Sequence, residues 1–208
     1  MANQNIVIID YGMGNIGSIR NMLQYLGEKV SVSSDPEVIK QADKLILPGV
    51  GHFDRAMENI EKFSLREVIT EMALIRKVPF LGICLGMQLM CNSSEEGTSP
   101  GLSLVNAKVK KYVFPEEIKL KVPHMSWNYI QQCKKSDLLT GLDDKSRFYF
   151  VHSYFVDCEL ESDILTRTTY GHPFVSAFES GNLVGVQFHP EKSHKYGISL
   201  FKNFLASF

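Results

Sequence analysis

The sequence has little that would suit a membrane, secreted or nucleic-acid-binding protein. Its formal net charge is only −1 and its pI is near 6.6, so it has no basic excess to attract nucleic acid or an anionic membrane. No apolar run approaches the ~18 residues that a membrane-spanning helix needs, and no signal-peptide pattern follows Met1. These absences predict a cytoplasmic protein.

Cysteine is also scarce and lacks any C-x-x-C pairing. The four cysteines are Cys84, Cys91, Cys133 and Cys158. Their spacing argues against a disulfide framework or a zinc site and suits a reducing compartment. We see no pattern for a metal or a cofactor, and no repeat or linker. The chain of 208 residues can bury a full core, so we expect one domain over 1–208.

The most informative segment that is present is Gly82-Ile83-Cys84-Leu85-Gly86, which follows the apolar run 78–81. This pattern is typical of a nucleophile elbow, a tight strand-to-helix turn that strains the backbone of the nucleophile. The turn places Cys84 at a helix N-terminus, where N–H groups and the helix dipole favour thiolate over thiol. A buried cysteine between two packing glycines is the alternative, and these five residues alone leave both open.

A second motif, His189-Pro190-Glu191, follows a strand predicted over 183–188. Pro190 favours an extended His189, so His189 and Glu191 should project to one side with Cα atoms roughly 6.6 Å apart. A histidine held by a carboxylate is the base that a nucleophilic cysteine needs. Alone, the motif would more often be a solvated surface turn. Together with the elbow it predicts the catalytic set Cys84, His189 and Glu191.

Strands and helices alternate in the first half of the chain. Strands are predicted at 6–9, 30–32, 45–47 and 80–84, and helices begin near 16, 35 and 64, the last with a capping box at Ser64 to Glu67. This order predicts an α/β fold with a doubly wound, mostly parallel, flavodoxin-like sheet and the elbow at its ligand-binding edge. The later strands predict an antiparallel extension of the same sheet, and a last helix begins near Tyr196. These later strands are 107–113, 119–122, 149–154, 164–169 and 175–178.

The segments 82–88 and 188–191 together resemble the class I (triad) glutamine amidotransferases. Four further segments resemble, within that family, the glutaminase subunits of imidazole glycerol phosphate synthase. They are Ile9-Asp10-Tyr11-Gly12-Met13-Gly14-Asn15, Pro48-Gly49-Val50-Gly51, Val122-Pro123-His124-Met125-Ser126-Trp127-Asn128 and Phe148-Tyr149-Phe150-Val151-His152-Ser153-Tyr154. The resemblance covers nearly the whole chain, from the first strand to Ser193.

This resemblance implies a reaction and a partner. The chain would hydrolyse L-glutamine to glutamate and ammonia through a thioester on Cys84, without a cofactor. The ammonia would pass to a separate (β/α)₈ cyclase subunit. That subunit would make imidazole glycerol phosphate and an aminoimidazole carboxamide ribotide in histidine biosynthesis.

The resemblance also implies residues around the elbow that bind the substrate. N–H groups of the oxyanion site would come from Val50, Gly51 and Leu85, although 48–51 alone would read as an ordinary Pro-Gly turn. The substrate-binding residues would be Gly49, Gln88, Glu95, Ser153 and Tyr154. Glu95 is preferred to Glu96 for the substrate α-amino group because the family's acidic residue falls near it. A solvated acidic loop is the alternative.

The partner would meet the loop that carries the single tryptophan. Its contact residues would be Pro123, His124, Met125 and Trp127, with Trp127 as anchor and core packing as the alternative for that side chain. Two residues depart from the family pattern. His52 replaces a small residue and should face solvent. Ser126 replaces a glycine, and a serine would be strained if this position needed a positive φ. This departure keeps open the alternative that the partner is a paralogous synthase that amidinates surface sugars.

Two other classes fit the residues less well. A doubly wound cysteine peptidase would usually place a histidine directly after the nucleophile, where this chain has Leu85. An inactive, purely regulatory subunit would have no need for an intact set of Cys84, His189 and Glu191. The sequence therefore favours a glutaminase.

Overall fold

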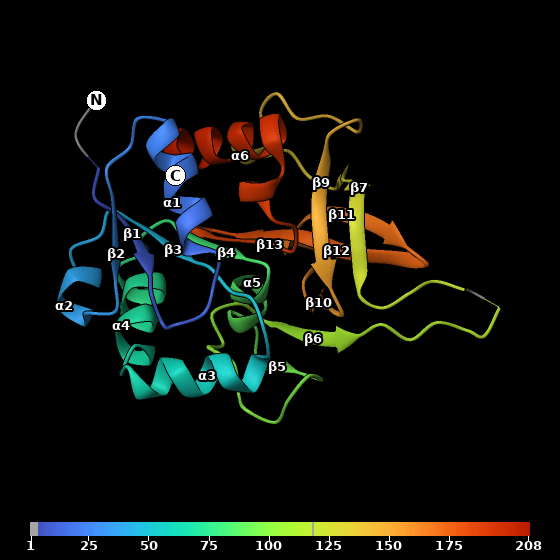
Figure 1. The fold of residues 1–208 in the computed structure, drawn as a ribbon, viewed down its shortest axis with the longest axis horizontal. Helices are drawn as coiled ribbons and strands as arrows, with labels where there is room; N and C mark the ends of the chain where they lie inside the picture. The colour runs from blue at the N-terminus through green and yellow to red at the C-terminus, as the bar shows by residue number, and fades with distance from the viewer. Residues whose placement is uncertain (1–3, 118) are drawn as a thin grey trace.

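The computed structural model describes residues 4–117 and 119–208 (Figure 1). Residues 1–3 and 118 lie outside the described part. The expectation about a signal peptide at Met1 therefore falls outside it, as do those four positions of the domain predicted over 1–208.

The first half alternates strands and helices. Its elements are β1 (Ile6–Ile9), α1 (Ile16–Tyr25), β2 (Val30–Ser33), α2 (Pro36–Ile39), β3 (Lys44–Leu47), α3 (Phe53–Lys62), α4 (Arg66–Thr70), the π-helical turn η1 (Glu71–Ile75), β4 (Phe80–Ile83) and α5 (Leu85–Leu89). The strand-rich half contains β5 (Ser93–Ser94), β6 (Ala107–Lys111), β7 (His124–Tyr129), β8 (Gln131–Gln132), β9 (Arg147–His152), β10 (Tyr154–Cys158), β11 (Ile164–Tyr170), β12 (His172–Ser180) and β13 (Leu183–Val186). Three 3₁₀ turns, η2 (Asp137–Leu139), η3 (Glu161–Asp163) and η4 (Pro190–Lys192), and the helix α6 (His194–Ser207) are the remaining elements.

The parallel part of the main sheet has the order β2-β1-β3-β4-β13. Helices α1 and α6 cover one face, and α3, α4 and α5 cover the other (Figure 1). Alternation along β1 shows why both faces are apolar. Ile6 and Ile8 pack in the core beneath α1 and α6, whereas Val7 and Ile9 pack in the core beneath α3 to α5. The predicted doubly wound sheet is confirmed.

The antiparallel extension begins at β12, which pairs with β13, and continues through β10 to β6. The short strand β5 at the edge pairs with β6 in parallel. One part of the prediction was wrong, because 149–154 is not one strand of this sheet. Instead β9 ends at His152 and pairs with β7 in a separate two-stranded sheet. Phe148 and Phe150 of β9 pack on Phe188, with ring centroids 4.0 and 5.6 Å apart, which holds β9 over the end of β13 rather than beside it.

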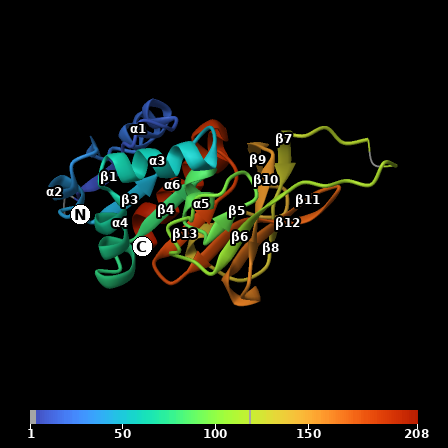
Figure 2. The same ribbon diagram turned by 90° about the horizontal axis from the view of Figure 1, so that it is seen from below.

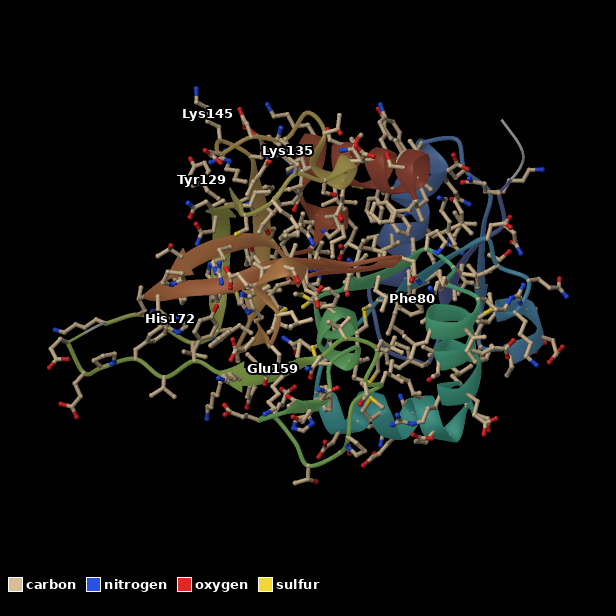
Figure 3. The ribbon with its side chains drawn as sticks, turned by 180° about the vertical axis from the view of Figure 1, so that it is seen from behind. Phe80, Tyr129, Lys135, Lys145, Glu159 and His172 are labelled. Carbon is tan, nitrogen blue, oxygen red and sulfur yellow. The ribbon has the colours of Figure 1, made fainter. Side chains whose placement is uncertain are left out.

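Two local predictions also need correction, and one helix was not predicted. Residues 119–122 form no strand and are exposed, in the part of the chain before β7 that extends away from the sheets (Figure 2). Ser64 has φ 55° and caps no helix, so α4 starts at Arg66. The amphipathic helix α3 was not predicted, although its buried residues recur at helical spacing. Figure 3 contrasts the interior Phe80 of β4 with Tyr129 and Lys145 at the surface.

Candidate active site

Cys84 lies at the sharp turn between β4 and α5. Its φ of 55° and ψ of −110° are unusual for a residue with a side chain, as the elbow pattern predicts. A Cβ on Gly86 would collide with the carbonyl oxygen of Leu47, and one on Gly82 would collide with the Met90 sulfur. The two glycines thus allow the close packing that the strained turn needs.

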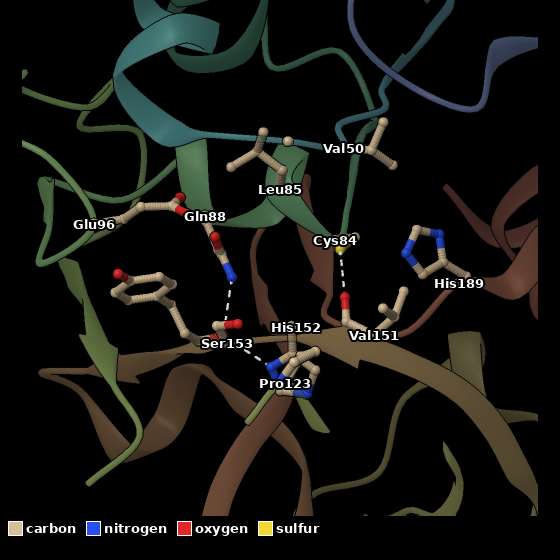
Figure 4. A pocket seen from close by; sticks show the side chains of 12 residues that line it. Val50, Cys84, Leu85, Gln88, Glu96, Pro123, Val151, His152, Ser153 and His189 are labelled. Carbon is tan, nitrogen blue, oxygen red and sulfur yellow. Dashed lines mark hydrogen bonds between the residues drawn. The ribbon is translucent and has the colours of Figure 1, made fainter. Parts of the chain in front are cut away.

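The elbow opens into a pocket of about 280 Å³ at the carboxyl edge of the parallel strands (Figure 4). Its walls come from the segments after β3, β4 and β13 and from the turn between β9 and β10. The lining residues are Val50, Gly51, Cys84, Leu85, Gln88, Glu96, Pro123, Val151, His152, Ser153, Tyr154 and His189. The volume suits a small molecule.

His189 and Glu191 form a buried pair beside Cys84. The Nδ1 atom of His189 lies 2.8 Å from Oε1 of Glu191, which also accepts a hydrogen bond of 3.2 Å from Asn15. The backbone differs from the prediction, because Pro190 begins a 3₁₀ turn instead of continuing an extended segment. With Nδ1 held by a carboxylate, Nε2 is the ring atom left for proton transfer on the pocket side.

The electrostatics of His189 favour the imidazolium form. Burial, the largest single influence, lowers its pKa, but the charge of a Cys84 thiolate and the hydrogen bond with Glu191 raise it to about 10. No described residue forms a hydrogen bond with Nε2, so we attribute the effect of Cys84 to its charge rather than to a formed hydrogen bond. A charged donor thus stands next to the sulfur at neutral pH.

The segment Pro48–Gly51 follows β3 and borders the pocket opposite Val151. Val50 and Gly51 line the pocket together with Leu85, the first residue of α5. Gly49 lies behind this wall, buried against Leu85. The hydroxyl of Tyr11 donates a buried hydrogen bond of 2.7 Å to the Pro48 carbonyl and fixes the start of the segment.

The predicted substrate-binding residues do not all reach the pocket. Gln88, Ser153 and Tyr154 line it, whereas Glu95 is exposed and its carboxylate accepts a hydrogen bond from the Lys111 N–H. The acidic residue that lines the pocket is Glu96, one position further on. Burial raises the pKa of Glu96, and a 2.9 Å hydrogen bond from the Phe53 N–H partly opposes that rise.

The four predicted partner-contact residues lie in three different environments. Met125 and Trp127 project from the exposed face of β7, and Pro123 lines the pocket. His124 is fully buried, so it cannot form a surface contact as it stands. Trp127 stacks on His194 with an interplanar angle of 4° and a centroid distance of 5.5 Å. It is therefore a half-packed surface side chain rather than a core residue.

The two departures from the family pattern are structurally mild. Ser126 pairs with Phe150 in the β7–β9 ladder, and its φ is not positive. The strain considered for a serine at this position therefore does not arise. His52 precedes α3 and is exposed, as expected.

Sequence reasoning missed Gln187, which is fully buried next to the nucleophile. Its Nε2 atom lies 3.8 Å from Sγ of Cys84. No local signal marks Gln187, because its contact with Cys84 depends on the parallel pairing of β13 with β4, which brings together the residues that follow these two strands. For metals, no group of three or more His, Cys, Asp or Glu residues within 4–117 and 119–208 could hold an ion. None of the helices described is long and apolar enough to cross a membrane.

A strained cysteine at the edge of a doubly wound sheet, beside a carboxylate-bound histidine, is an arrangement suited to acyl transfer through a thiol. The chain belongs to the family described as Glutamine amidotransferase class-I, whose model matches residues 7–208. It is 50% identical over 200 residues to imidazole glycerol phosphate synthase subunit HisH 2 of Methanococcus maripaludis, covering 96% of this chain and 98% of that one. Subunit HisH 2 of Pseudomonas aeruginosa is 46% identical with the same coverage, and subunit HisH of Sulfurimonas denitrificans is 46% identical, covering 96% of each chain.

Solved structures agree with the fold. PurLQS from Thermotoga maritima superposes with a TM-score of 0.73 at 17% identity and covers 98% of each chain. A structure described as a glutamine amidotransferase has a TM-score of 0.70 at 17% identity and covers 96% of each chain.

Proposed function

We propose that this chain is the glutaminase subunit of an imidazole glycerol phosphate synthase and supplies ammonia for histidine biosynthesis. The similarity to HisH subunits over 96% of the chain supports the assignment. The structural observation that carries it is the strained, pocket-facing Cys84 beside the carboxylate-bound His189. We expect the protein to act in the cytoplasm.

In the first half of the reaction, the Cys84 thiolate attacks the side-chain carbonyl carbon of glutamine and a C–S bond forms. N–H groups of the Val50–Gly51 segment and of Leu85 stabilise the oxyanion, an effect of ~3 kcal/mol for each well-placed donor. The His189 imidazolium then protonates the leaving nitrogen as the C–N bond breaks. Ammonia departs and a γ-glutamyl thioester remains.

In the second half, water attacks the thioester. His189, now neutral, takes a proton from the water, and the Glu191 carboxylate holds its ring and stabilises the returning charge. The C–S bond breaks, so glutamate leaves and the pair of thiolate and imidazolium is restored. Glutamine and water have become glutamate and ammonia.

We assign the substrate α-ammonium group to Glu96, because this carboxylate, unlike that of Glu95, lines the pocket. Glu96→Gln should raise KM for glutamine about tenfold or more, since it removes a charged hydrogen bond, and should change kcat less. Glu95→Gln is the matched control and should change KM little. Steady-state glutaminase assays compare the two. An increase in KM confined to Glu95→Gln would reverse the assignment.

The partner we propose is a (β/α)₈ cyclase subunit in a heterodimer. Free ammonia mostly protonates in neutral water and then loses its nucleophilicity, so direct delivery to the partner preserves the reaction. Co-purification with the native partner, followed by glutamine labelled with ¹⁵N in its amide, should place the label in imidazole glycerol phosphate. Label in an amidinated sugar instead would identify the paralogous synthase as the partner.

Contact with the partner should also control turnover. If the Val50–Gly51 peptide must turn to complete the oxyanion site, the isolated chain should hydrolyse glutamine slowly, and the complex with synthase substrate should be faster. Trp127→Ala should weaken association or uncouple the two activities, with little change in glutamine binding. Phe63→Ala is the control, because Phe63 and Trp127 are 40% and 39% exposed but lie on different elements. Full activity of the isolated chain would refute the gating. Unchanged association and coupling in Trp127→Ala would exclude this contact.

A further inference from the structure

A continuous line of hydrogen bonds leads away from the sulfur of Cys84. Gln187 Nε2 lies 3.8 Å from Sγ, and Gln187 Oε1 lies 3.0 Å from Nε2 of Gln88. The same Nε2 atom of Gln88 lies 3.1 Å from the carbonyl oxygen of Tyr154. Two side-chain amides thus connect the nucleophile to the backbone at the start of β10.

The line continues through two buried histidines to β7. The Tyr154 carbonyl also faces Nδ1 of His152 at 2.8 Å, and Nε2 of His152 lies 3.0 Å from Nδ1 of His124. Asn128 Nδ2 lies 3.3 Å from His124 Nε2 and donates to the Thr169 carbonyl at 2.9 Å. Every link lies within hydrogen-bonding distance.

Backbone carbonyls fix which atom donates in each of these hydrogen bonds, because a carbonyl oxygen can only accept a hydrogen bond. Gln88 must turn its NH₂ group toward the Tyr154 carbonyl, so its second Nε2 hydrogen points to Gln187. Gln187 must then accept with Oε1 and turn its own NH₂ group toward Cys84. The orientation of a side-chain amide is usually an open choice, but here the Tyr154 carbonyl decides it.

The histidines follow the same rule. Asn128 directs a donor at Nε2 of His124, so His124 donates from Nδ1 to His152, and His152 donates from Nδ1 to the Tyr154 carbonyl. Burial lowers the pKa of His124 to about 4 and that of His152 to about 3. Both rings are therefore neutral single tautomers at neutral pH.

We propose that Gln187 is a further catalytic residue, whose side-chain amide donates a hydrogen bond to the Cys84 sulfur and stabilises it as the thiolate. Gln88 acts on it as a positioning residue, because it holds the amide in its donating orientation. The role rests on the proposed glutaminase function of Cys84. The donor acts in the resting enzyme and again when the thioester breaks and the sulfur regains its charge.

The test removes the hydrogen-bond donor and measures the reactivity of the Cys84 sulfur directly. Gln187→Met keeps the length of the side chain and loses the N–H group. We expect alkylation of Cys84 by iodoacetamide at neutral pH to slow about tenfold, and the midpoint of its rate–pH profile to rise by about one unit. Gln187→Glu, which offers only acceptors, should be slower still. In both variants kcat should fall while KM for glutamine changes little.

The other titratable groups around the sulfur stay in place in these variants. They are His189 and Glu191 of the 189–192 segment, Tyr11 after β1, His152 of β9 and Glu96 of the pocket wall. A shift in the profile therefore reports on the amide. His152→Leu should shift the midpoint less than Gln187→Met, because the Tyr154 carbonyl still orients Gln88. Wild-type alkylation profiles in correctly folded Gln187 variants would overturn the proposal.

A second measurement needs no Gln187 variant. In the ¹⁵N-labelled chain, Cys84→Ala should shift the side-chain amide resonances of Gln187, while those of the exposed Gln131 stay unchanged. An unchanged Gln187 amide would contradict the contact. Neither alkylation nor this spectrum requires turnover, so a failure here is distinguishable from a failure of the glutaminase assignment.

Discussion

Cys84→Ala should abolish glutamine-dependent synthesis by the complex and leave ammonia-dependent synthesis nearly unchanged. The physical reason is that Cys84 would bond only to glutamine, whereas free ammonia can reach the partner's acceptor without it. We expect the glutamine-dependent rate to fall by about 10⁴-fold or more, the size seen when a nucleophile is removed. Parallel assays of the reconstituted complex with glutamine and with ammonium salts measure both activities.

Cys133→Ser is the matched control, because Cys133 is an exposed cysteine that contributes nothing to the pocket. It should retain both activities. The circular dichroism spectrum of Cys84→Ala should equal that of the wild type, which would show that the variant is folded. Near-normal turnover of glutamine by Cys84→Ala would exclude a mechanism through a thioester on Cys84.

His189→Ala should be far more damaging than Glu191→Gln. The first change removes the group that carries the proton, and we expect a loss in kcat of about 10³-fold or more. The second change leaves the ring in place and weakens only its orientation and charge, so its effect should be roughly a hundredfold smaller. Steady-state kinetics of both variants give the ratio. Comparable losses would make Glu191 as necessary as the proton carrier.

Covalent trapping tests the same pair without turnover. An electrophilic analogue of glutamine should label wild-type Cys84 quickly and the His189→Ala protein slowly, because the imidazolium that favours the thiolate is gone. Removing the Cys84 charge should in turn lower the pKa of His189, since burial alone lowers it. NMR titration of the ring in Cys84→Ala checks this. Equal labelling rates in the two proteins would mean that another group activates the thiol.

The pairing of His189 with Glu191 shows how far a local motif can lead. Two residues separated by one proline have few possible relative orientations. Their contact could therefore be predicted, although the predicted backbone conformation of the segment was wrong. The 3₁₀ turn replaced the predicted extension because Pro190 suits the first position of such a turn, and the contact survived at 2.8 Å.

Glu95 and Glu96 show where local patterns stop. Adjacent side chains near a strand point in opposite directions, and composition offers no reason to prefer either. In the structure, the Lys111 N–H donates a hydrogen bond to the Glu95 carboxylate, and the Phe53 N–H at the start of α3 donates one to the Glu96 carboxylate. These two hydrogen bonds decide which carboxylate lines the pocket. Both partners come from distant parts of the chain.

The sequence by itself determined the doubly wound α/β core and the reactive elbow, because these depend on periodicity, glycine and proline, all of which act between neighbours. Tertiary structure alone decided that β9 leaves the main sheet, that His124 is buried rather than exposed, and that Gln187 meets Cys84. These outcomes depend on contacts between residues far apart in the sequence, such as His124 and His152, which are 28 residues apart, and Cys84 and Gln187, which are 103 residues apart. Such contacts form only when the whole core packs, so no local pattern encodes them.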